Sequence, residues 1–535
     1  MFNFFERESK TIIGAAAIVG ILSLTSRLVG FIRDRILAGT FGAGDTLDVY
    51  YAAFKIPDFL FNLIVVGALS ASFIPIFLSH YHKPLNRHRA WDFTNNAVHL
   101  IGGTILVFSL IFIFFATPLA HVIAPGFEEF KQVKVTLFMR IMFLGQIFLA
   151  ISLIYGSVLQ SLKHFFVYSL APLFYNAGIL IGALWLEPLF GSVGLAWGVV
   201  LGAFLHLCTQ VIGMRGTGYR YRFLFNIRSK DICEMGRLMG PRTIGLAVNQ
   251  LMFMILTIIA STFVAGSLTV FQFAYNIQFF AVGIFGVSFA IAVFPTLSEF
   301  IEKKELSKFI ETVSNTTSQL CYLLIPMTLL FLIFRAQIVR VVVGAGAFDW
   351  SATILTADTL AFFALTFIPQ SLVYLLARAF YALHDTITPL TIAFVSAFVG
   401  ILSAFLFRQS FGVISLAIAY SISSIINALL LWISLRQRVG TLQESIIFSS
   451  LLKMVTCGLF AAVVMQFLKP IVVSFIPLET FIGVFLQAFI AGGAGLLVYV
   501  ILGMFLGVQE QKRLIDALKR HALRHVKLAE VAPDN

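Results

Sequence analysis

The sequence is poor in charged residues. Asp, Glu, Lys and Arg make up 12% of its 535 residues, compared with about 25% in a typical soluble domain, whereas hydrophobic residues make up 59%. This composition excludes an ordinary water-soluble domain. Apolar runs of about 20 residues recur along the chain, and each is long enough to cross a bilayer as a helix. We therefore predict an all-α polytopic membrane protein.

Motifs of catalysis and metal binding are also missing from the sequence. The four cysteines are scattered singly, and no pair has the spacing of a metal-binding or redox motif. The sequence contains no Walker loop, no zinc motif and no Ser, His and Asp at telling spacings. We therefore expect no enzymatic activity, no cofactor and no bound metal. Any transport would be facilitated or driven by an ion gradient or the membrane potential.

The net charge of +12 is distributed in a pattern typical of membrane proteins. Lys and Arg gather in loops near residues 83–89, 215–230 and 303–308 and in the C-terminal tail, whereas the intervening loops hold few. Because basic residues favour cytoplasmic loops, the asymmetry predicts that both termini are cytoplasmic. It also argues against nucleic acid as a partner. The tail after about Gln509 has the pattern of a basic amphipathic helix on the inner leaflet, or of a solvated charged tail.

The apolar runs predict about fourteen membrane spans. They lie near residues 11–40, 46–79, 92–117, 135–160, 166–186, 191–213, 238–263, 267–297, 312–334, 352–382, 387–407, 411–435, 447–469 and 479–506. Gly30, Pro57 and Pro389 are candidate bend points within them.

An internal repeat relates two parts of the chain at an offset of about 221 residues. FGSVGLAWG (190–198) matches FGVISLAIA (411–419), and LQSLKH (159–164) matches FYALHD (380–385). A unit of six spans crosses the membrane an even number of times, so both copies have the same orientation, and such parallel repeats form two lobes around a cavity. We predict an N-lobe (1–220), a C-lobe (221–440), a C-terminal helix pair (441–508) and a basic cytoplasmic tail (509–535).

Residues 26–75 are an exception to the scarcity of charge. On insertion scales a charge at the centre of a membrane costs about 2.5–3.5 kcal/mol, so it persists where it faces water, an opposite charge or a ligand. We expect the charges of this stretch to line a polar path through the membrane. They are Arg27, Arg33, Asp34, Arg35, Asp48, Lys55 and Asp58.

Arg27 and Arg33 are the candidates for binding an anion. A guanidinium is permanently charged, and its planar fork matches the oxygens of a phosphate. Arg33 lies six residues after Arg27, about 120° around a regular helix, so both would reach one cavity if Gly30 loosened the turn. Arg27 is also placed to form a structural pair with Asp34, seven residues later on the same face. Both interpretations remain open at the level of the sequence.

Asp48 and Lys55 share a helical face, since they too are seven residues apart. They are candidates to pair with each other or with Arg33 and Asp34. In the second copy of the repeat, the region aligned with the two arginines is apolar apart from a few neutral groups, and Lys55 aligns with Asn276. If the charges were only structural, both copies would be expected to need them. The asymmetry therefore favours a ligand-binding function in the first lobe.

Four motifs in the first lobe carry a resemblance to a known family. They are SRLVGFIRD (26–34), FGAG (41–44), DVYYAAFKIPD (48–58) and GALSASFIPIF (67–77), and similar segments continue at 282–300 and 380–390. In these segments the chain resembles the MurJ/MviN lipid II flippases of the MOP exporter superfamily. The fourteen spans, arranged as two six-helix lobes and a final pair, fit the same family.

The resemblance implies a function and a site. The expected function is transport of lipid II, an undecaprenyl-pyrophosphate-linked peptidoglycan precursor, across the inner membrane by alternating access. It implies that Arg27 and Arg33 bind the head group in a cationic cavity, and that Asp48 and Lys55 are polar positions of the family motif. Ser26, Asp34, Asn62 and Asn276 complete the predicted substrate-binding set. The expected partners are lipid II, membrane lipids and cell-wall synthesis proteins, and we expect a monomer.

The chain departs from the family pattern in two respects. Positions where some members carry a pair of arginines and an acid read Phe61, Asn62 and Val66 here, and another family arginine falls at Asn276. The cavity should therefore be less cationic. Carboxylates that would form a sodium site on the seventh and eleventh spans are also missing. Two alternatives stay open: a polysaccharide-repeat or multidrug exporter of the same superfamily, and a non-transporting scaffold in cell-wall synthesis.

Overall fold

The computed structural model describes residues 12–66 and 72–516, and within these residues all regular secondary structure is helical. The first half contains α1 (Ile12–Phe41), α2 (Asp45–Phe61), η2 (Asn62–Val66), α3 (Ile74–Tyr81), η4 (Pro84–Asn86), α4 (Arg87–Phe114), α5 (Ala116–Ile123), α6 (Glu129–Ser161), α7 (Phe165–Ile181), η5 (Gly182–Leu186), α8 (Glu187–Phe190), α9 (Val193–Met214) and α10 (Lys230–Ala260). The second half contains α11 (Ser267–Val282), η6 (Gly283–Val287), α12 (Ser288–Glu302), α13 (Leu306–Ile333), α14 (Arg335–Val342), α15 (Trp350–Ala364), α16 (Phe367–Ala382), α17 (Ile387–Phe411), α18 (Ile414–Val439), α19 (Glu444–Phe475) and α20 (Phe481–Phe505).

Within the described residues, each predicted span coincides with one of these helices or with a series of them; residues 67–71 of the second predicted span lie outside the described residues. Among the described residues, ten helices are long and apolar enough to cross a membrane, and the bent pair α15 and α16 raises the number to eleven. The remaining three predicted spans correspond to α1, to α2 with α3, and to α10. The chain is therefore a multi-pass helical membrane protein, as predicted. Of the predicted tail helix, residues 509–516 are helical, and the rest lies outside the described residues.

By its internal packing the chain divides into two compact units. The first unit contains the chain up to Phe273 together with residues 342–352 and 404–416, and the second contains the remainder. In the first unit α10 packs against α2, α4 and α5, which explains why it belongs there. The lobe boundaries that the repeat suggested, at 220 and 440, stay a prediction.

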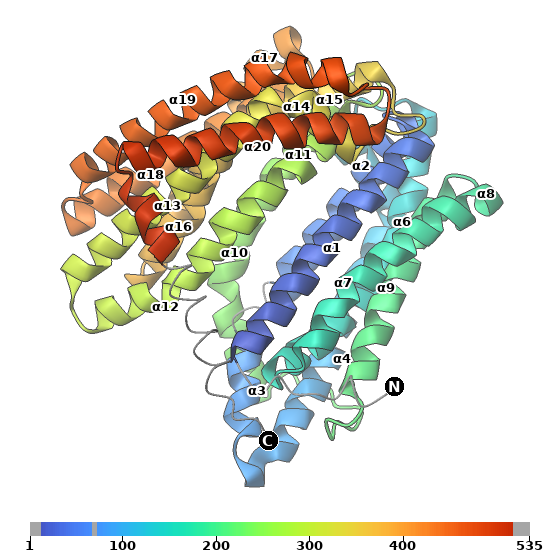
Figure 1. Ribbon diagram of the computed structural model, residues 1–535. Helices are drawn as coiled ribbons and strands as arrows, with labels where there is room; N and C mark the ends of the chain where they lie inside the picture. The colour runs from blue at the N-terminus through green and yellow to red at the C-terminus, as the bar shows by residue number, and fades with distance from the viewer. Residues whose placement is uncertain (1–11, 67–71, 517–535) are drawn as a thin grey trace, which may run out of the picture. The chain divides into compact units, whose positions relative to one another are not determined.

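Helix packing in the first unit depends on glycine at one interface. α9 packs against both α6 and α7, and α1 runs alongside α7 (Figure 1). Gly178 of α7 and Gly182, the first residue of η5, face Gly202 and Gly198 of α9, and a Cβ on Gly198 would lie 2.5 Å from the Cα of Gly182. Small residues let membrane helices approach closely enough for backbone contact. Because these glycines recur at every fourth position, they set how closely α7 packs against α9. α7 contributes Asn176 to the site described below.

The second unit has a more conventional apolar core. α13, α16 and α12 pack around Phe309, Leu376 and Phe380, all of which are fully buried. The last two long helices, α19 and α20, lie side by side (Figure 1). They pack against α13 through a cluster that includes Cys457 and Tyr499, and the Tyr499 hydroxyl donates to the carbonyl of Tyr322 at 3.0 Å.

The backbone preserves the repeat that the sequence indicated. The π-helical segments η2 and η6 are separated by 221 residues, taking 283 minus 62. Lys163 and His384, which match each other in the repeat, both have left-handed backbones, with φ of 64° and 59°. Such φ values are uncommon for residues other than glycine, so their recurrence at matching turns is specific. Gly191 and Gly412, another matched pair, also have positive φ.

The three candidate bend points have different outcomes. α1 continues through Gly30 without interruption, so the expected loosening of the helix there is not observed. Pro57 lies inside α2, and the π-helical segment η2 begins five residues later. Pro389 lies in the first turn of α17, where a proline costs little because the backbone N–H groups of that turn have no partner within the helix.

Candidate functional site

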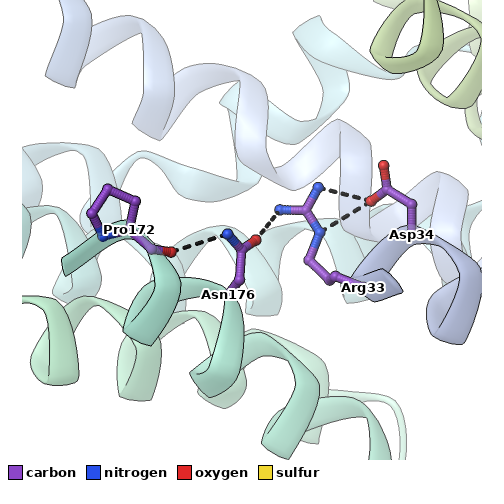
Figure 2. Close-up of polar contacts among 4 residues, drawn as sticks. All are labelled: Arg33, Asp34, Pro172 and Asn176. Atoms are coloured by element: carbon purple, nitrogen blue, oxygen red, sulfur yellow. Dashed lines mark hydrogen bonds and ion pairs between the residues drawn. The ribbon is translucent and has the colours of Figure 1, made fainter. Parts of the chain in front are cut away.

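Arg33 is held in place by the hydrogen bonds that it donates to side chains of two helices, α1 and α7. Its Nε and Nη2 donate to Oδ1 of Asp34 at 3.0 and 2.7 Å, and its Nη1 donates to Oδ1 of Asn176 on α7 at 2.9 Å. The Asn176 amide is itself oriented, because its Nδ2 donates to the carbonyl of Pro172 at 3.0 Å (Figure 2). The chain Pro172–Asn176–Arg33–Asp34 thus positions one guanidinium between α1 and α7.

This arrangement leaves part of the guanidinium available. Arg33 carries five N–H donors, and three are used by Asp34 and Asn176, so two remain for a further acceptor. The Arg33 side chain is 23% exposed, whereas the Asp34 side chain is 3% exposed. The site therefore offers an oriented, partly exposed positive group with two N–H donors that could bind an anion.

Asp34 pairs with its neighbour in the sequence. The structural interpretation of Arg27 placed it opposite Asp34, whereas the Asp34 carboxylate accepts two hydrogen bonds from Arg33. Arg27 and Ser26 lie nearly two turns earlier on α1, where both are partly exposed. Arg35 is also partly exposed. Because α1 is continuous, Arg27 and Arg33 project about 120° apart, and the helix does not turn them toward one another.

Asp48 anchors the start of another helix. It is 2% exposed, and its carboxylate accepts from the backbone N–H of Gly266 at 2.7 Å, the N–H of Thr269 at 2.8 Å and the Thr269 hydroxyl at 2.7 Å. The Gly266 N–H lies just before α11 and the Thr269 N–H in its first turn, where no helical carbonyl is available to it. A carboxylate there also compensates the positive end of the helix dipole. This contact explains a buried charge without a ligand, so a substrate-binding function for Asp48 stays a prediction.

Lys55 lies two turns after Asp48 on α2 and does not use it as a hydrogen-bond partner. Its ammonium donates to Oε1 of Gln272 on α11 at 2.9 Å and lies 6.0 Å from the centre of the Phe253 ring. The sequence had left Asp48 and Lys55 to pair with each other or with Arg33 and Asp34. Their hydrogen bonds go instead to α11 and the residue before it, which supply three donors to the carboxylate and a neutral amide to the ammonium. Asp58, one turn further, interacts electrostatically with Lys55.

The two predicted asparagines are placed differently. Asn62 begins the π-helical segment η2, and its Nδ2 donates to the carbonyl of Asp58 at 2.8 Å, so it supports the local backbone. Asn276 is on α11, in the second unit, and is partly exposed. The structure thus brings together Arg33 and Asp34, and separately attaches Asp48 and Lys55 to α11. The predicted substrate-binding set as a whole remains a prediction.

Sequence reasoning missed the neutral residues that hold these charges. Asn176, Gln272 and Thr269 are amide or hydroxyl side chains within helices that are otherwise mostly apolar. An amide in the apolar run LFYNAGIL of α7 is a usable signal, since a polar group at that depth needs a partner. The sequence does not say which side chain pairs with this amide, because that depends on how the helices pack.

The second unit contains a buried network of neutral side chains. Gln278 Nε2 donates to Oγ1 of Thr366 at 2.8 Å and to Oε1 of Gln370 at 2.6 Å, and Gln370 Nε2 donates to the Tyr420 hydroxyl at 2.5 Å. The network joins α11, α16 and α18, and its members are between 0% and 7% exposed. It was not predicted, because single glutamines in apolar helices do not indicate which helices they connect.

Metal ligands do not gather in the described part of the chain. Over residues 12–66 and 72–516, no group of three or more His, Cys, Asp or Glu side chains is placed to share an ion.

Comparison with known sequences identifies one family. The family model described as "Lipid II flippase MurJ" matches residues 37–486. A "Probable lipid II flippase MurJ" of Buchnera aphidicola subsp. Schizaphis graminum is 28% identical over 512 residues, which are 92% of this chain and 96% of the relative. A protein of the same description from Vibrio cholerae is 26% identical over 435 residues, covering 79% of this chain and 83% of the relative.

Comparison with solved structures gives the same fold. A structure titled "Lipid II flippase MurJ, inward closed conformation" has a TM-score of 0.74 at 21% identity, covering 91% of this chain and 98% of that one. An inward-facing multidrug resistance MATE family transporter of the MOP superfamily has a TM-score of 0.66 at 13% identity, covering 80% of this chain and 99% of that one. At these identities the likeness concerns the fold alone.

Proposed function

Because the chain belongs to the lipid II flippase MurJ family, we propose that it carries lipid II across the membrane that it spans. The support comes from the family match over residues 37–486 and from the charged site in the first unit. Lipid II presents a pyrophosphate bridge, and an arginine fork is well matched to phosphate oxygens. The observation that carries the proposal is the Arg33 guanidinium, which is oriented by Asp34 and Asn176 and retains two donors.

In this proposal Arg33 binds the pyrophosphate, and Lys55 contributes to the charge of the cavity. A contribution of Arg27, which projects about 120° away from Arg33 on the continuous helix α1, stays a prediction. Asp34 and Asn176 are positioning residues, because they act through Arg33. The Arg33–Asp34 ion pair also limits the cost of keeping a positive charge in the membrane when substrate is absent. An arriving phosphate would use the remaining donors and need not displace Asp34. Asp48 has a structural function at the start of α11.

We further propose alternating access as the mechanism, with the anion as the ligand that shifts the equilibrium. A ligand favours the conformation in which it makes better contacts. Bound pyrophosphate would use the remaining donors of Arg33 and so favour closure around the head group. The protein would act as a monomer in the bacterial inner membrane, with both termini on the cytoplasmic side. The loops rich in Lys and Arg, near 215–230 and 303–308, support this orientation.

The test is a translocation assay in proteoliposomes containing the full chain and lipid II, with and without a membrane potential. Arg33→Gln removes the charge and the fork, and we expect at least about a tenfold loss of rate, the equivalent of about 1.4 kcal/mol. Arg408→Gln is the matched control, because it removes an exposed arginine at the end of α17 and should leave the rate unchanged.

Substrate identity is tested in the same system. Purified lipid II and a lipid-linked O-antigen unit are compared as substrates and as ligands. Preference for the O-antigen unit would assign the chain to a different transport function within the same fold. If well-folded Arg33→Gln transported lipid II at the wild-type rate, the guanidinium would not have the proposed function.

A further inference from the structure

The connection between α9 and α10 carries a regular alternation of aromatic and basic residues. It reads YRYRFLFNIR over residues 219–228, and this segment has neither helix nor turn up to residue 226. The residues at odd positions are all apolar or aromatic, namely Tyr219, Tyr221, Phe223, Phe225 and Ile227. The even positions include three arginines, Arg220, Arg222 and Arg228. In an extended chain, successive side chains point to opposite sides, so the alternation gives an apolar row and a basic row.

Two buried amides of α4 hold this 219–228 segment in place. Asn95 Nδ2 donates to the carbonyl of Arg220 at 3.0 Å, and Asn95 Oδ1 accepts from the N–H of Arg222 at 3.2 Å. Asn96 makes both bonds to one residue, accepting from the N–H of Asn226 at 2.8 Å and donating to its carbonyl at 2.9 Å. These contacts involve residues 220, 222 and 226, as expected for a strand that faces a partner with alternate residues.

Ring contacts fix the beginning of the apolar row. The Tyr219 hydroxyl donates to Asn95 Oδ1 at 2.6 Å, and its ring lies 5.7 Å from that of Trp91. The Tyr221 hydroxyl is 2.8 Å from Nε2 of His99, and the His99 ring lies 4.7 Å from the ring of Phe223. The 219–228 segment is therefore a fixed part of the first unit.

The fixed segment nevertheless leaves its apolar row uncovered. Tyr221 is 63% exposed, Phe223 75%, Phe225 55% and Ile227 57%. A single exposed apolar residue is ordinary, but a row of four indicates a surface that has a partner. The row begins a few residues after α9 ends at Met214 and finishes just before α10 begins at Lys230. Because α9 is apolar and long enough to cross the membrane, the row lies near the level where a membrane meets water.

The charge of this surface is of one sign. Residues 215–230 contain no acidic residue and five basic ones, all of them exposed: Arg215, Arg220, Arg222, Arg228 and Lys230. The nearest acid beyond them, Asp231, is paired with His80 at 3.1 Å, and Glu234 follows one turn later. A basic row beside an apolar row at the end of membrane spans matches an anionic lipid, whose phosphate and acyl chain would meet the two rows.

We propose that the 219–228 segment is a binding site for anionic phospholipids of the membrane leaflet, and that it secures the connection between α9 and α10 to that leaflet. Phosphate groups would be bound by Arg220, Arg222 and Arg228. Phe223, Phe225 and Ile227 would enter the region between head groups and acyl chains. The inference depends on the chain being a membrane protein and not on which substrate it transports.

The experiment measures lipid binding to the purified full chain by native mass spectrometry, with phosphatidylglycerol and phosphatidylcholine added separately. Wild type should bind phosphatidylglycerol in preference. Arg220→Gln/Arg222→Gln should weaken that binding about thirtyfold, because each basic side chain near an anionic surface contributes about 1 kcal/mol. Lys303→Gln/Lys304→Gln is the matched control, since it removes two exposed positive charges from the connection between α12 and α13 and should leave the binding unchanged.

A second variant tests the apolar row. Phe223→Ser/Phe225→Ser keeps every charge and should also weaken phosphatidylglycerol binding, whereas a purely electrostatic surface would be unaffected. All substituted side chains are exposed, and unchanged thermal unfolding confirms that the variants are folded. Equal loss in the Lys303/Lys304 control, or no loss in Arg220→Gln/Arg222→Gln, would overturn the proposal.

Two competitors separate other ligands from a membrane phospholipid. If a single-stranded oligonucleotide binds through Arg220 and Arg222 and phosphatidylglycerol does not, the surface recognises nucleic acid and the proposal is wrong. If undecaprenyl pyrophosphate alone binds there, the surface belongs to the substrate path and the proposal is again wrong. Transport that fails in Arg33→Gln while phosphatidylglycerol binding is retained would show that the two proposals stand or fall independently.

Discussion

Two sets of buried contacts, one in each unit, join helices with different chemistry. In the first unit, ionised groups connect α1 to α7 and α2 to the start of α11, through Arg33, Lys55 and Asp48. In the second, Gln278, Gln370 and Tyr420 connect α11, α16 and α18 through neutral amide and hydroxyl groups. The backbone features of the repeat, such as η2 and η6, are nevertheless shared. A neutral network can therefore join helices of this fold, so the positive charge of Arg33 between α1 and α7 is a candidate for a function beyond helix packing.

The largest expected effect comes from removing the carboxylate that anchors α11. Asp48→Ala deletes three hydrogen bonds and leaves buried N–H groups of Gly266 and Thr269 without an acceptor. We expect a loss of about 3 kcal/mol or more in the free energy of unfolding. Thermal unfolding of the purified protein in detergent measures it. Asp48→Asn should lose less, because the amide oxygen still accepts; equal losses would contradict the helix-anchor interpretation.

The neutral network of the second unit provides the opposite test. Gln370→Leu removes one of the two acceptors of the buried Gln278 amide and leaves one of its N–H groups unsatisfied, and we expect a loss of about 1–3 kcal/mol in the free energy of unfolding. Replacing both, as Gln278→Leu/Gln370→Leu, removes the unsatisfied amide and should recover most of that loss. Lipid II transport by the folded double variant should be close to wild type. A transport defect at full stability would show that the second unit also contributes to the site.

A conservative change at Arg33 tests whether charge or shape matters in the first unit. Arg33→Lys keeps the positive charge but cannot bind Asp34, Asn176 and a phosphate at once with a planar fork. We expect transport to fall about tenfold with little change in thermal unfolding. Rates equal to wild type would show that charge alone is sufficient. The Asn176→Ala variant, which leaves the charge and frees the guanidinium, should reduce transport less.

The smallest expected effect is the pH dependence of the stability that Asp385 contributes. Asp385 lies in the turn before α17, outside the membrane spans. Burial by itself would raise the pKa of Asp385, but hydrogen bonds from Thr388, the charge of Arg438 and the N–H of Ile387 lower that pKa overall. The matching turn of the first unit has His164 at this position. Asp385 should therefore stabilise the second unit at pH values above the usual Asp pKa of about 3.9, and this stabilisation is lost as pH falls through its lowered pKa.

The measurement is thermal unfolding of wild type and Asp385→Asn between pH 3 and pH 7, with a difference of less than about 1 kcal/mol expected at neutral pH. Asparagine keeps an oxygen for the N–H groups at the start of α17 and removes the dependence on pH. The difference between the two proteins should shrink as pH falls. A difference that grows toward low pH would mean that the folded protein raises the pKa of Asp385 instead of lowering it.

Much of the fold was predictable because membrane spans are defined locally. An apolar run of about 20 residues is sufficient information for a helix that crosses a bilayer, and all fourteen predicted spans coincide with helices. The offset of 221 residues was also visible, since turns such as those at Lys163 and His384 need similar residues to adopt the same backbone. The presence of charge in residues 26–75 marked the region of the candidate site.

The contacts within the site were not predictable from spacing. A separation of seven positions puts Asp48 and Lys55 on one face of α2. A shared face does not decide which side chain from another helix each of them contacts. The start of α11 offered Asp48 better donors than a lysine, and Gln272 took the place of the carboxylate for Lys55. Likewise, Asp34 is bound by the adjacent Arg33, a pairing that the sequence analysis did not propose.

By itself the sequence determined a helical membrane protein with a duplicated arrangement and a concentration of charge near its beginning, because hydropathy and repeat spacing are properties of the chain alone. Only the tertiary structure decided which charges serve the fold and which are presented to a ligand. The physical reason is that a buried charge is stabilised by the donors and acceptors brought to it from other helices. For Asp48 those partners came from α11, and for Arg33 they came from Asp34 and α7.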